Sequence, residues 1–186
     1  MLAHPVAGNQ ATEMSTAKNN VLMVPVIIVL LAIIGCRKPA EYAGTFSRLD
    51  NRVIDSSNVL STEQKDHLFQ MIQVIEDSTG AQIAVVVIQS LKGRDLNKYS
   101  LQVAEHLSLG RYGYNDGVLL TIALEEGKAR IEVGTGLEKT LSDETSARIL
   151  NGIMIPEFQE GKVFIGLRNG ILQIGEIVHR HDGSRP

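Results

Sequence analysis

The sequence predicts an α/β fold, a three-layer α/β/α sandwich in which a small mixed β-sheet has helices on both faces. From residue 53 onward, apolar runs of strand length alternate with longer segments of helical periodicity. One run, residues 82–88, is apolar almost throughout, which is typical of a strand covered on both faces. Residues 118–124 and 129–133 are separated by a four-residue turn, so they are expected to pair antiparallel.

The first two helices flank the run at residues 82–88. Ser61 and Gln64 have the spacing of a capping box, apolar residues at helical spacing follow them, and Gly80 marks the end of this helix. A second helix is expected over residues 96–107, before Gly110, because apolar side chains recur there three or four positions apart.

Two more helices are predicted in the C-terminal part of the chain. Ser142 can cap the first, and Pro156 is expected to end or kink it near Ile155, because proline lacks a backbone N–H and collides with the preceding turn. The second has one long apolar stripe over residues 164–178, which includes Leu167. We expect this stripe to pack against the sheet.

Composition limits both the number of domains and the classes of function. The chain has 186 residues, 44% of them hydrophobic, and a formal net charge of -3, which suits one well-packed core. Aromatic residues make up 4% of the chain, and there is no Trp and no basic stripe, so the features that nucleic-acid binding needs are missing from the sequence. We expect one globular domain, a monomer, and no nucleic-acid partner.

The first 35 residues are predicted to be a signal peptide that ends in a lipobox. Lys18 precedes an uncharged apolar stretch over residues 21–35, which is shorter than the roughly 20 residues that a membrane span needs. Residues 33–36, Ile-Ile-Gly-Cys, resemble the bacterial lipobox, whose cysteine is lipidated and becomes the mature N-terminus. The alternative is a buried or anchoring helix in which Cys36, the single cysteine, is incidental.

The rest of the domain organisation follows from cleavage before Cys36. Residues 36–50 are rich in Pro, Gly and small polar side chains and are expected to be a tether, residues 51–180 to be the folded domain, and residues 181–186 to be a tail. The protein would then be anchored through its N-terminal lipid to the cell membrane or the outer membrane, on the extracytoplasmic side. Translation from Met1 and from Met14 both remain open.

Two short motifs resemble ligand-binding signatures but lack a residue that each requires. In GTGLEK, Lys139 stands where the dinucleotide fingerprint has its third glycine. In YGYNDG, Tyr112 occupies the first ligand position of a calcium hand loop, which needs an acid. The motifs therefore identify no nucleotide site and no catalytic residue.

Five segments follow one another along the folded part of the chain: RVIDSSNVLSTEQ, GAQIAVVVI, NDGVLLTIAL, RIEVGTGLE and ILNGIMIPEFQEGKVFIGLRNGI. Their order and spacing resemble those of the TPM domain family, and the resemblance runs from Arg52 to Val178. This family includes bacterial envelope proteins and a chloroplast thylakoid protein involved in photosystem II repair. The resemblance implies a Rossmann-like α/β/α fold, divalent cation binding in some members, and an acid phosphatase activity that is reported but not general.

The resemblance also implies a metal site with Asp55, Asn115, Asp116 and Glu138 as ligands. We expect Asp55 in the loop before the first helix, Asn115 and Asp116 just before a strand, and Glu138 after the turn at residues 134–136. Carboxylate and amide oxygens are hard donors that suit calcium or magnesium. A loop cap at Asp55 and a turn at Asp116 are equally open interpretations.

The chain departs from the family pattern at two of these places. The family commonly has Asp-Asn-Gly where this chain has Asn115-Asp116-Gly117, so the carboxylate is shifted by one residue. Thr135 stands where an aromatic residue is common. Both departures keep an acidic edge while changing the expected ligand geometry.

Two functions are compatible with these features. The first is a lipid-anchored, extracytoplasmic domain that binds calcium or magnesium and acts as an interaction or adaptor module for an unidentified envelope protein. The second is a metal-dependent acid phosphatase in which Asp116 or Asp55 positions an attacking water between cation and phosphate. The sequence shows no dedicated base, cysteine nucleophile or phosphate-binding loop to favour the second, so we favour the first.

Overall fold

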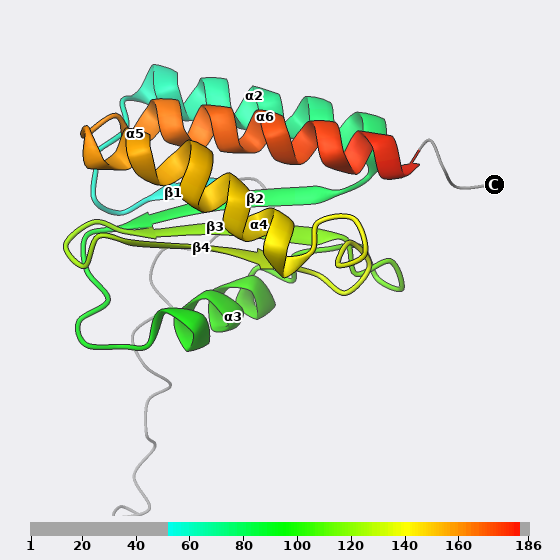
Figure 1. The fold of residues 1–186 in the computed structure, drawn as a ribbon, viewed down its shortest axis with the longest axis horizontal. Helices are drawn as coiled ribbons and strands as arrows, with labels where there is room; N and C mark the ends of the chain where they lie inside the picture. Colours follow the sequence, from blue (N-terminus) through cyan, green and yellow to red (C-terminus); the bar gives the residue numbers. More distant parts are fainter. Residues whose placement is uncertain (1–51, 183–186) are drawn as a thin grey trace, which may run out of the picture. The chain divides into compact units, whose positions relative to one another are not determined.

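The computed structural model describes residues 52–182, which form a four-stranded sheet with helices on both faces (Figure 1). The predicted signal peptide, Cys36, the tether and the end of the tail lie outside the described residues. Within residues 52–182, none of the helices combines the length and the apolar character that crossing a membrane requires.

The sheet is mixed, as predicted. Its strands are β1 (Val53–Asp55), β2 (Gln82–Ile88), β3 (Gly117–Ala123) and β4 (Lys128–Val133), and they lie in the order β1-β2-β3-β4. The first three strands are parallel, and β4 pairs antiparallel with β3. The strand predicted to be covered on both faces, β2, lies inside the sheet, and its residues from Ile83 to Ile88 are all buried.

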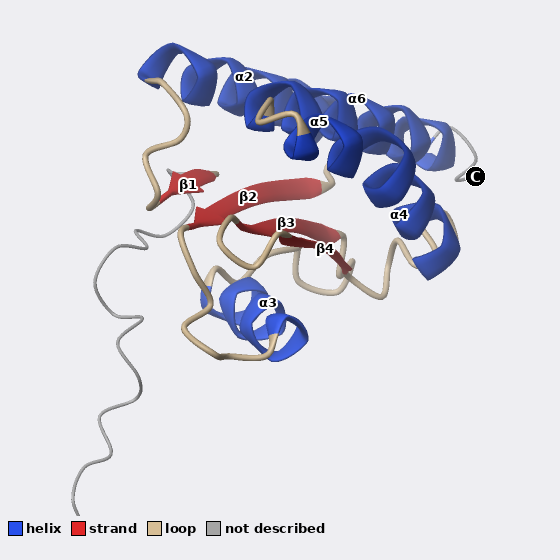
Figure 2. Ribbon diagram, turned by 60° about the vertical axis from the view of Figure 1, so that its left-hand side comes forward, coloured by secondary structure: helices blue, strands red, loops and turns tan. Residues whose placement is uncertain are grey.

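The helices form the two outer layers of the sandwich. Figure 2 shows α2, α4, α5 and α6 on one face of the sheet and α3 on the other. Their bounds are α2 (Thr62–Thr79), α3 (Leu96–His106), α4 (Asp143–Ile149), α5 (Ile155–Gln159) and α6 (Val163–Asp182), with a π-helical segment, η1 (Leu150–Met154), between α4 and α5. The predicted α/β/α sandwich is confirmed.

The two parallel crossovers of the sheet have opposite hands. Both β1-α2-β2 and β2-α3-β3 move by one strand in the same direction, yet α2 and α3 cover opposite faces. One of the two connections must therefore be left-handed, although parallel crossovers are right-handed in the great majority of proteins. This arrangement leaves one face to α3 and gathers the other helices on the opposite face.

The larger part of the core lies between the sheet and the layer of α2 and α6. Leu68 and Ile72 of α2, Val85 of β2, and Leu167 and Ile171 of α6 are all fully buried there. The apolar stripe predicted over residues 164–178 is thus part of the core.

The N-terminal cap of α2 has the predicted geometry. The Ser61 hydroxyl accepts a hydrogen bond from the Gln64 amide over 3.3 Å, and the Gln64 side chain accepts one from the Ser61 amide over 2.9 Å. Gly80 ends the helix in a left-handed conformation with φ 74, which a residue without a Cβ adopts most easily.

Of the two outcomes predicted for Pro156, an end or a kink of the helix near Ile155, the end is wrong. The chain stays helical past Pro156 to Gln159, because η1 widens the turn that precedes the proline. In that wider turn the Ile155 amide donates to the Leu150 carbonyl, five residues back. A proline ring collides with the carbonyl four residues back in a regular α-helix, and the wider turn relieves this clash.

Candidate functional site

Two loops lie against each other at the end of the sheet where β3 begins. They are residues 114–116 and 134–138, and we call the pair the rim. The Gly136 amide donates a hydrogen bond to the Asn115 carbonyl over 3.0 Å. A Cβ on Gly136 would overlap the carbonyl oxygen of Tyr114, so this close approach requires glycine.

The rim contains three of the four predicted metal ligands. Asn115 is exposed and has a left-handed backbone with φ 50, a conformation that Asn tolerates better than most residues. Glu138 is also exposed, two residues after Gly136. Asp116 differs from both, because it is 1% exposed.

The carboxylate of Asp116 is bound by Arg111. One carboxylate oxygen accepts from the Arg111 amide over 2.8 Å, and the other accepts from the guanidinium Nε and Nη2 over 2.7 and 2.5 Å. The Asp116 carbonyl accepts from the Gln82 amide over 3.0 Å, which ties the same turn to the start of β2. In this arrangement Asp116 holds the loop that precedes β3.

Arg111 is itself held from two further sides. Its guanidinium lies against Gly80 at the C-terminal end of α2, where a Cβ would overlap it. The carboxyl end of a helix carries a partial negative charge, and α2 has no basic residue in its own last turn. The guanidinium also lies over the ring of Tyr114, 4.3 Å from the ring centroid. Arg111 therefore places a positive charge between Asp116 and the end of α2.

Asp55 lies at the opposite end of the sheet from the rim. It is the last residue of β1 rather than part of a loop, and it pairs in register with Val87, which pairs with Ile122 near the end of β3. Asp116 comes just before the first residue of β3. Six residues of strand correspond to about 20 Å, so Asp55 and Asp116 cannot bind the same ion.

The carboxylate of Asp55 caps the loop that leads into α2. One oxygen accepts from the Ser57 amide over 3.0 Å and from the Ser57 hydroxyl over 2.6 Å. The other oxygen accepts from the Leu60 amide over 2.8 Å. The loop-cap interpretation, which the sequence left open, therefore describes the role of Asp55 in this structure.

The donor set of the rim is limited. Among the residues that the structure describes, no group of three or more His, Cys, Asp and Glu is placed to hold a metal ion. What the rim offers is the amide oxygen of Asn115, the carboxylate of Glu138 and nearby backbone carbonyls, with Asp116 bound to Arg111. The role of Arg111 as the partner of Asp116 was not predicted from the sequence. The feature that could have indicated it is a cationic residue five positions before a carboxylate in a turn.

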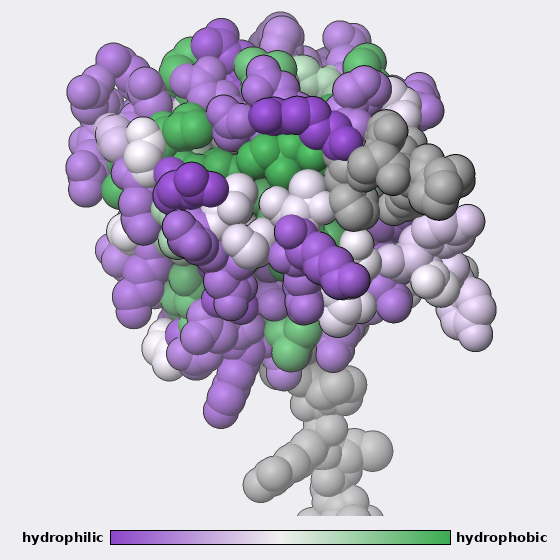
Figure 3. All heavy atoms as spheres, turned by 45° about the vertical axis from the view of Figure 1, so that its right-hand side comes forward, coloured by the Kyte–Doolittle hydropathy of each residue, from purple (hydrophilic) through white to green (hydrophobic). Residues whose placement is uncertain are grey.

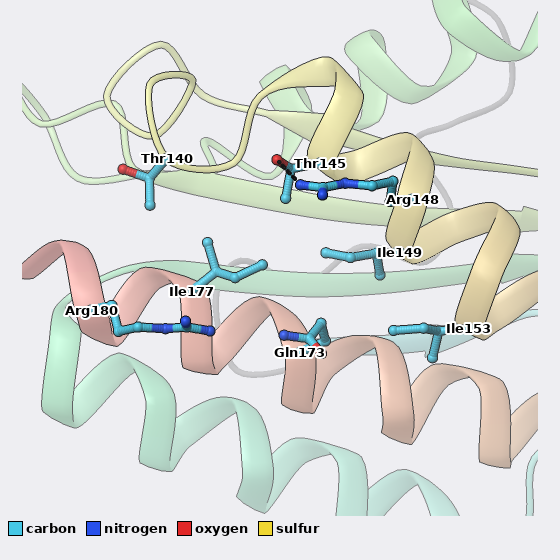
Figure 4. Close-up of a pocket in the computed structure, with 8 residues that line it drawn as sticks. All are labelled: Thr140, Thr145, Arg148, Ile149, Ile153, Gln173, Ile177 and Arg180. Carbon is cyan, nitrogen blue, oxygen red and sulfur yellow. Dashed lines mark hydrogen bonds between the residues drawn. The ribbon is translucent and has the colours of Figure 1, made fainter.

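A groove between α4 and α6 is a second feature that the sequence did not predict. It has a volume of about 530 Å³ and is lined by Thr140, Thr145, Arg148, Ile149, Ile153, Gln173, Ile177 and Arg180. Figure 4 shows Arg148 on the α4 wall and Arg180 on the α6 wall, each with its side chain running along its own helix. In Figure 3, apolar side chains lie at the bottom of a hollow with hydrophilic edges. The sequence did not predict the groove because the packing of α4 against α6 decides which helical faces meet there.

The part of the chain that forms the three-layer sandwich matches a known family. The TPM domain family matches residues 53–177, more than half of the chain. The chain therefore belongs to the TPM domain family. A comparison with curated proteins found no match.

Three solved structures share the fold. The N-terminal domain of a protein from P. gingivalis is 29% identical, with a TM-score of 0.66, over 72% of this chain and 85% of that chain. The BA42 protein from the psychrophilic bacterium Bizionia argentinensis is 21% identical, with a TM-score of 0.60, over 69% and 87%. The N-terminal domain of the cg2496 protein from Corynebacterium glutamicum is 17% identical, with a TM-score of 0.58, over 77% and 90%. The last two show a shared fold.

Proposed function

We propose that this TPM-domain protein is a lipid-anchored, extracytoplasmic module that binds calcium or magnesium at the rim and acts as an interaction or adaptor module in the cell envelope. The proposed anchor rests on the sequence around Cys36, which lies outside the described residues. The proposed cation site rests on the geometry of the rim.

The observation that carries the proposal is the backbone contact between the two loops of the rim. It brings Asn115 and Glu138, both exposed oxygen donors, to the same end of the domain. Calcium takes 6–8 oxygen ligands and accepts carbonyls and waters among them. Because the protein supplies few charged ligands here, we expect a weak site, with a Kd on the order of 10⁻⁴–10⁻³ M as in extracellular calcium modules.

Asp116 becomes a ligand in this proposal only when Arg111 moves away. The Arg111 guanidinium lies on the side of the Asp116 carboxylate that a metal cation would have to contact. Arg111 is 37% exposed, so it can turn into solvent without crossing the core. A bound divalent cation and Arg111 would then compete for the same carboxylate.

The phosphatase alternative is less well supported than the interaction module. To position an attacking water, Asp116 or Asp55 needs a carboxylate oxygen that can accept its proton. Both oxygens of Asp116 accept hydrogen bonds from Arg111, and both oxygens of Asp55 accept from Ser57 or Leu60. In this arrangement every carboxylate oxygen of Asp116 and Asp55 already accepts a hydrogen bond.

A titration of the protein with calcium and with magnesium, followed residue by residue by NMR, tests the proposal. We expect chemical-shift changes centred on the rim, and a weaker response in Glu138→Gln. Asp55→Asn is the matched control, because it removes a carboxylate at the other end of the sheet and should leave the response unchanged. Changes centred on Asp55, or no change at millimolar cation, would contradict the rim site.

A further inference from the structure

Hydrogen-bonded polar side chains connect the loop before β3 with α2. The Gln82 side chain accepts a hydrogen bond from the Gly110 amide over 2.9 Å and donates one to the Glu76 carboxylate over 3.1 Å. The same carboxylate oxygen accepts from the Arg52 guanidinium over 2.9 Å. We call Arg52, Glu76 and Gln82 the polar chain. It ends at the backbone of the residue just before Arg111.

The inner part of the polar chain is shielded from water. The side chain of Arg52 is 8% exposed and that of Glu76 is 28% exposed. A buried charge is costly unless it is paired and hydrogen-bonded, so Arg52 and Glu76 depend on each other. Hydrogen bonds in such surroundings are stronger than in water. Arg52 therefore fixes the carboxylate oxygen that the Gln82 side chain contacts.

The position of Gly110 leaves little room for adjustment. Its φ is 101, and a Cβ on it would lie 2.8 Å from the Gly117 amide nitrogen, so its backbone lies directly against the start of β3. Arg111 follows it, and both the amide and the guanidinium of Arg111 donate to Asp116. A shift of Gly110 would therefore change how Arg111 reaches the carboxylate.

Asp116 is held by a separate contact. Its carbonyl accepts from the backbone amide of Gln82 over 3.0 Å, and this bond does not involve the Gln82 side chain. Removal of that side chain would release Gly110, and with it Arg111, while Asp116 stays joined to the start of β2. The backbone of Gln82 thus places the carboxylate, and its side chain places the segment that carries the guanidinium.

We propose that Glu76 and Gln82 are positioning residues that hold Arg111 against Asp116 and thereby lower the affinity of the rim for cations. The inference rests on the cation site proposed above and describes how that site is regulated. A cation gains Asp116 as a ligand only from the state in which Arg111 has moved away. Each contact that favours the Arg111-bound state therefore weakens the apparent cation affinity.

Gln82→Ala in the full-length protein tests the proposal. The readouts are the solvent exchange of the Arg111 Nε–H, measured by NMR in EDTA, and a titration of the rim with calcium chloride. We expect faster exchange and a calcium affinity higher by roughly two- to tenfold, the equivalent of one hydrogen bond. Gln89→Ala is the matched control, because Gln89 follows the other end of β2 and donates to Glu125. It should change neither readout.

A reciprocal exchange of two side chains tests the path through Glu76. Gln82→Glu removes the donor to Glu76 and sets two carboxylates against each other, so it should speed the exchange of the Arg111 Nε–H. Adding Glu76→Gln places a donor opposite an acceptor again and restores the net charge. The double variant should therefore recover the wild-type exchange rate and calcium affinity. A double variant as perturbed as Gln82→Glu alone would overturn the role of Glu76.

The two readouts separate this proposal from the cation site itself. Equal Arg111 exchange in wild type and Gln82→Ala would overturn the positioning role, even if calcium shifts the rim signals. Faster exchange with an unchanged calcium affinity would overturn the link between positioning and cation binding. Faster exchange in Gln82→Ala, together with no response of the rim to calcium in either protein, would support the positioning role and reject the cation site.

Discussion

Arg111 donates three hydrogen bonds to Asp116, one from its backbone amide and two from its guanidinium, and the carboxylate that receives them is 1% exposed. The stretch Asn115-Asp116-Gly117 is therefore more than a turn that starts a strand. Its carboxylate joins the loop before β3 to a cation that also lies over Tyr114 and beside the end of α2. Asp116 has a structural role in the metal-free protein, and the proposed cation site must compete with that role.

Asp116→Asn is expected to lower the free energy of unfolding of the metal-free protein by about 2 kcal/mol, the order of a hydrogen bond to a charged group. A turn alone would tolerate the change, since Asn serves as well as Asp before Gly. Urea unfolding measures the effect. Asp66→Asn, on the exposed surface of α2, is the control, and equal stability of the two variants would contradict the structural role of Asp116.

Arg111→Gln is expected to lower the metal-free melting temperature and to increase the rise in that temperature on adding calcium. Without the guanidinium, Asp116 has no competing cation, so calcium should bind the native state more tightly and stabilise it more. Melting curves in EDTA and in millimolar calcium give both quantities. Arg148→Gln removes the same charge away from the rim, and a calcium response as large in this control would count against Asp116 as a ligand.

Leu167→Ala is expected to lower the free energy of unfolding by about 3 kcal/mol, because it leaves a cavity where a fully buried side chain packs. Leu167→Asp should abolish cooperative unfolding, since it places an unpaired charge in the core. Leu172→Ala, on the same helix but 51% exposed, should change stability by no more than about 0.5 kcal/mol. Circular dichroism during urea unfolding measures the stability of each variant. Equal stability of Leu167→Ala and Leu172→Ala would show that α6 is peripheral to the core.

Glu126 makes a contribution to stability that should depend on pH. The hydrogen bond from the Ser90 hydroxyl lowers the pKa of Glu126 below its usual 4.5. A carboxyl group with a lowered folded-state pKa stabilises the protein above the unfolded-state pKa, and that contribution is lost as pH falls through the folded-state pKa. Glu126→Gln should therefore be less stable than wild type at neutral pH, with a difference that shrinks below pH 4.5.

The control for this pH dependence is Glu125→Gln, at the exposed neighbouring position. Urea unfolding across the acidic range gives the stability difference for both variants. A Glu126→Gln difference that stays constant from neutral to acidic pH would show that the lowered pKa contributes nothing to stability.

Cys36→Ala is expected to leave an unprocessed precursor without lipid, because the predicted lipobox would lose its acceptor. Mass spectrometry of the membrane fraction measures processing and acylation. Ser47→Ala, in the predicted tether, is a control that should be processed normally. A mature, lipidated chain in the Cys36→Ala variant would show that the lipobox interpretation is incorrect.

Most of the fold was predictable because its elements carry local signals. Ser61 and Gln64 cap α2 through contacts three residues apart, and the apolar run of β2 reflects burial on both faces. Two features were not predictable. The strand β1 is three residues long, too short to show a period, and the π-helical turn before Pro156 depends on the local hydrogen bonds.

The sequence by itself determined the order of helices and strands and the buried stripe of α6, because both depend on side chains that are neighbours along the chain. The tertiary structure alone decided that Asp55 and Asp116 lie at opposite ends of the sheet and that Arg111 binds Asp116. It also decided that Arg148 and Arg180 line one groove. Strand register and helix packing set these distances, and both arise from contacts between segments far apart in the sequence.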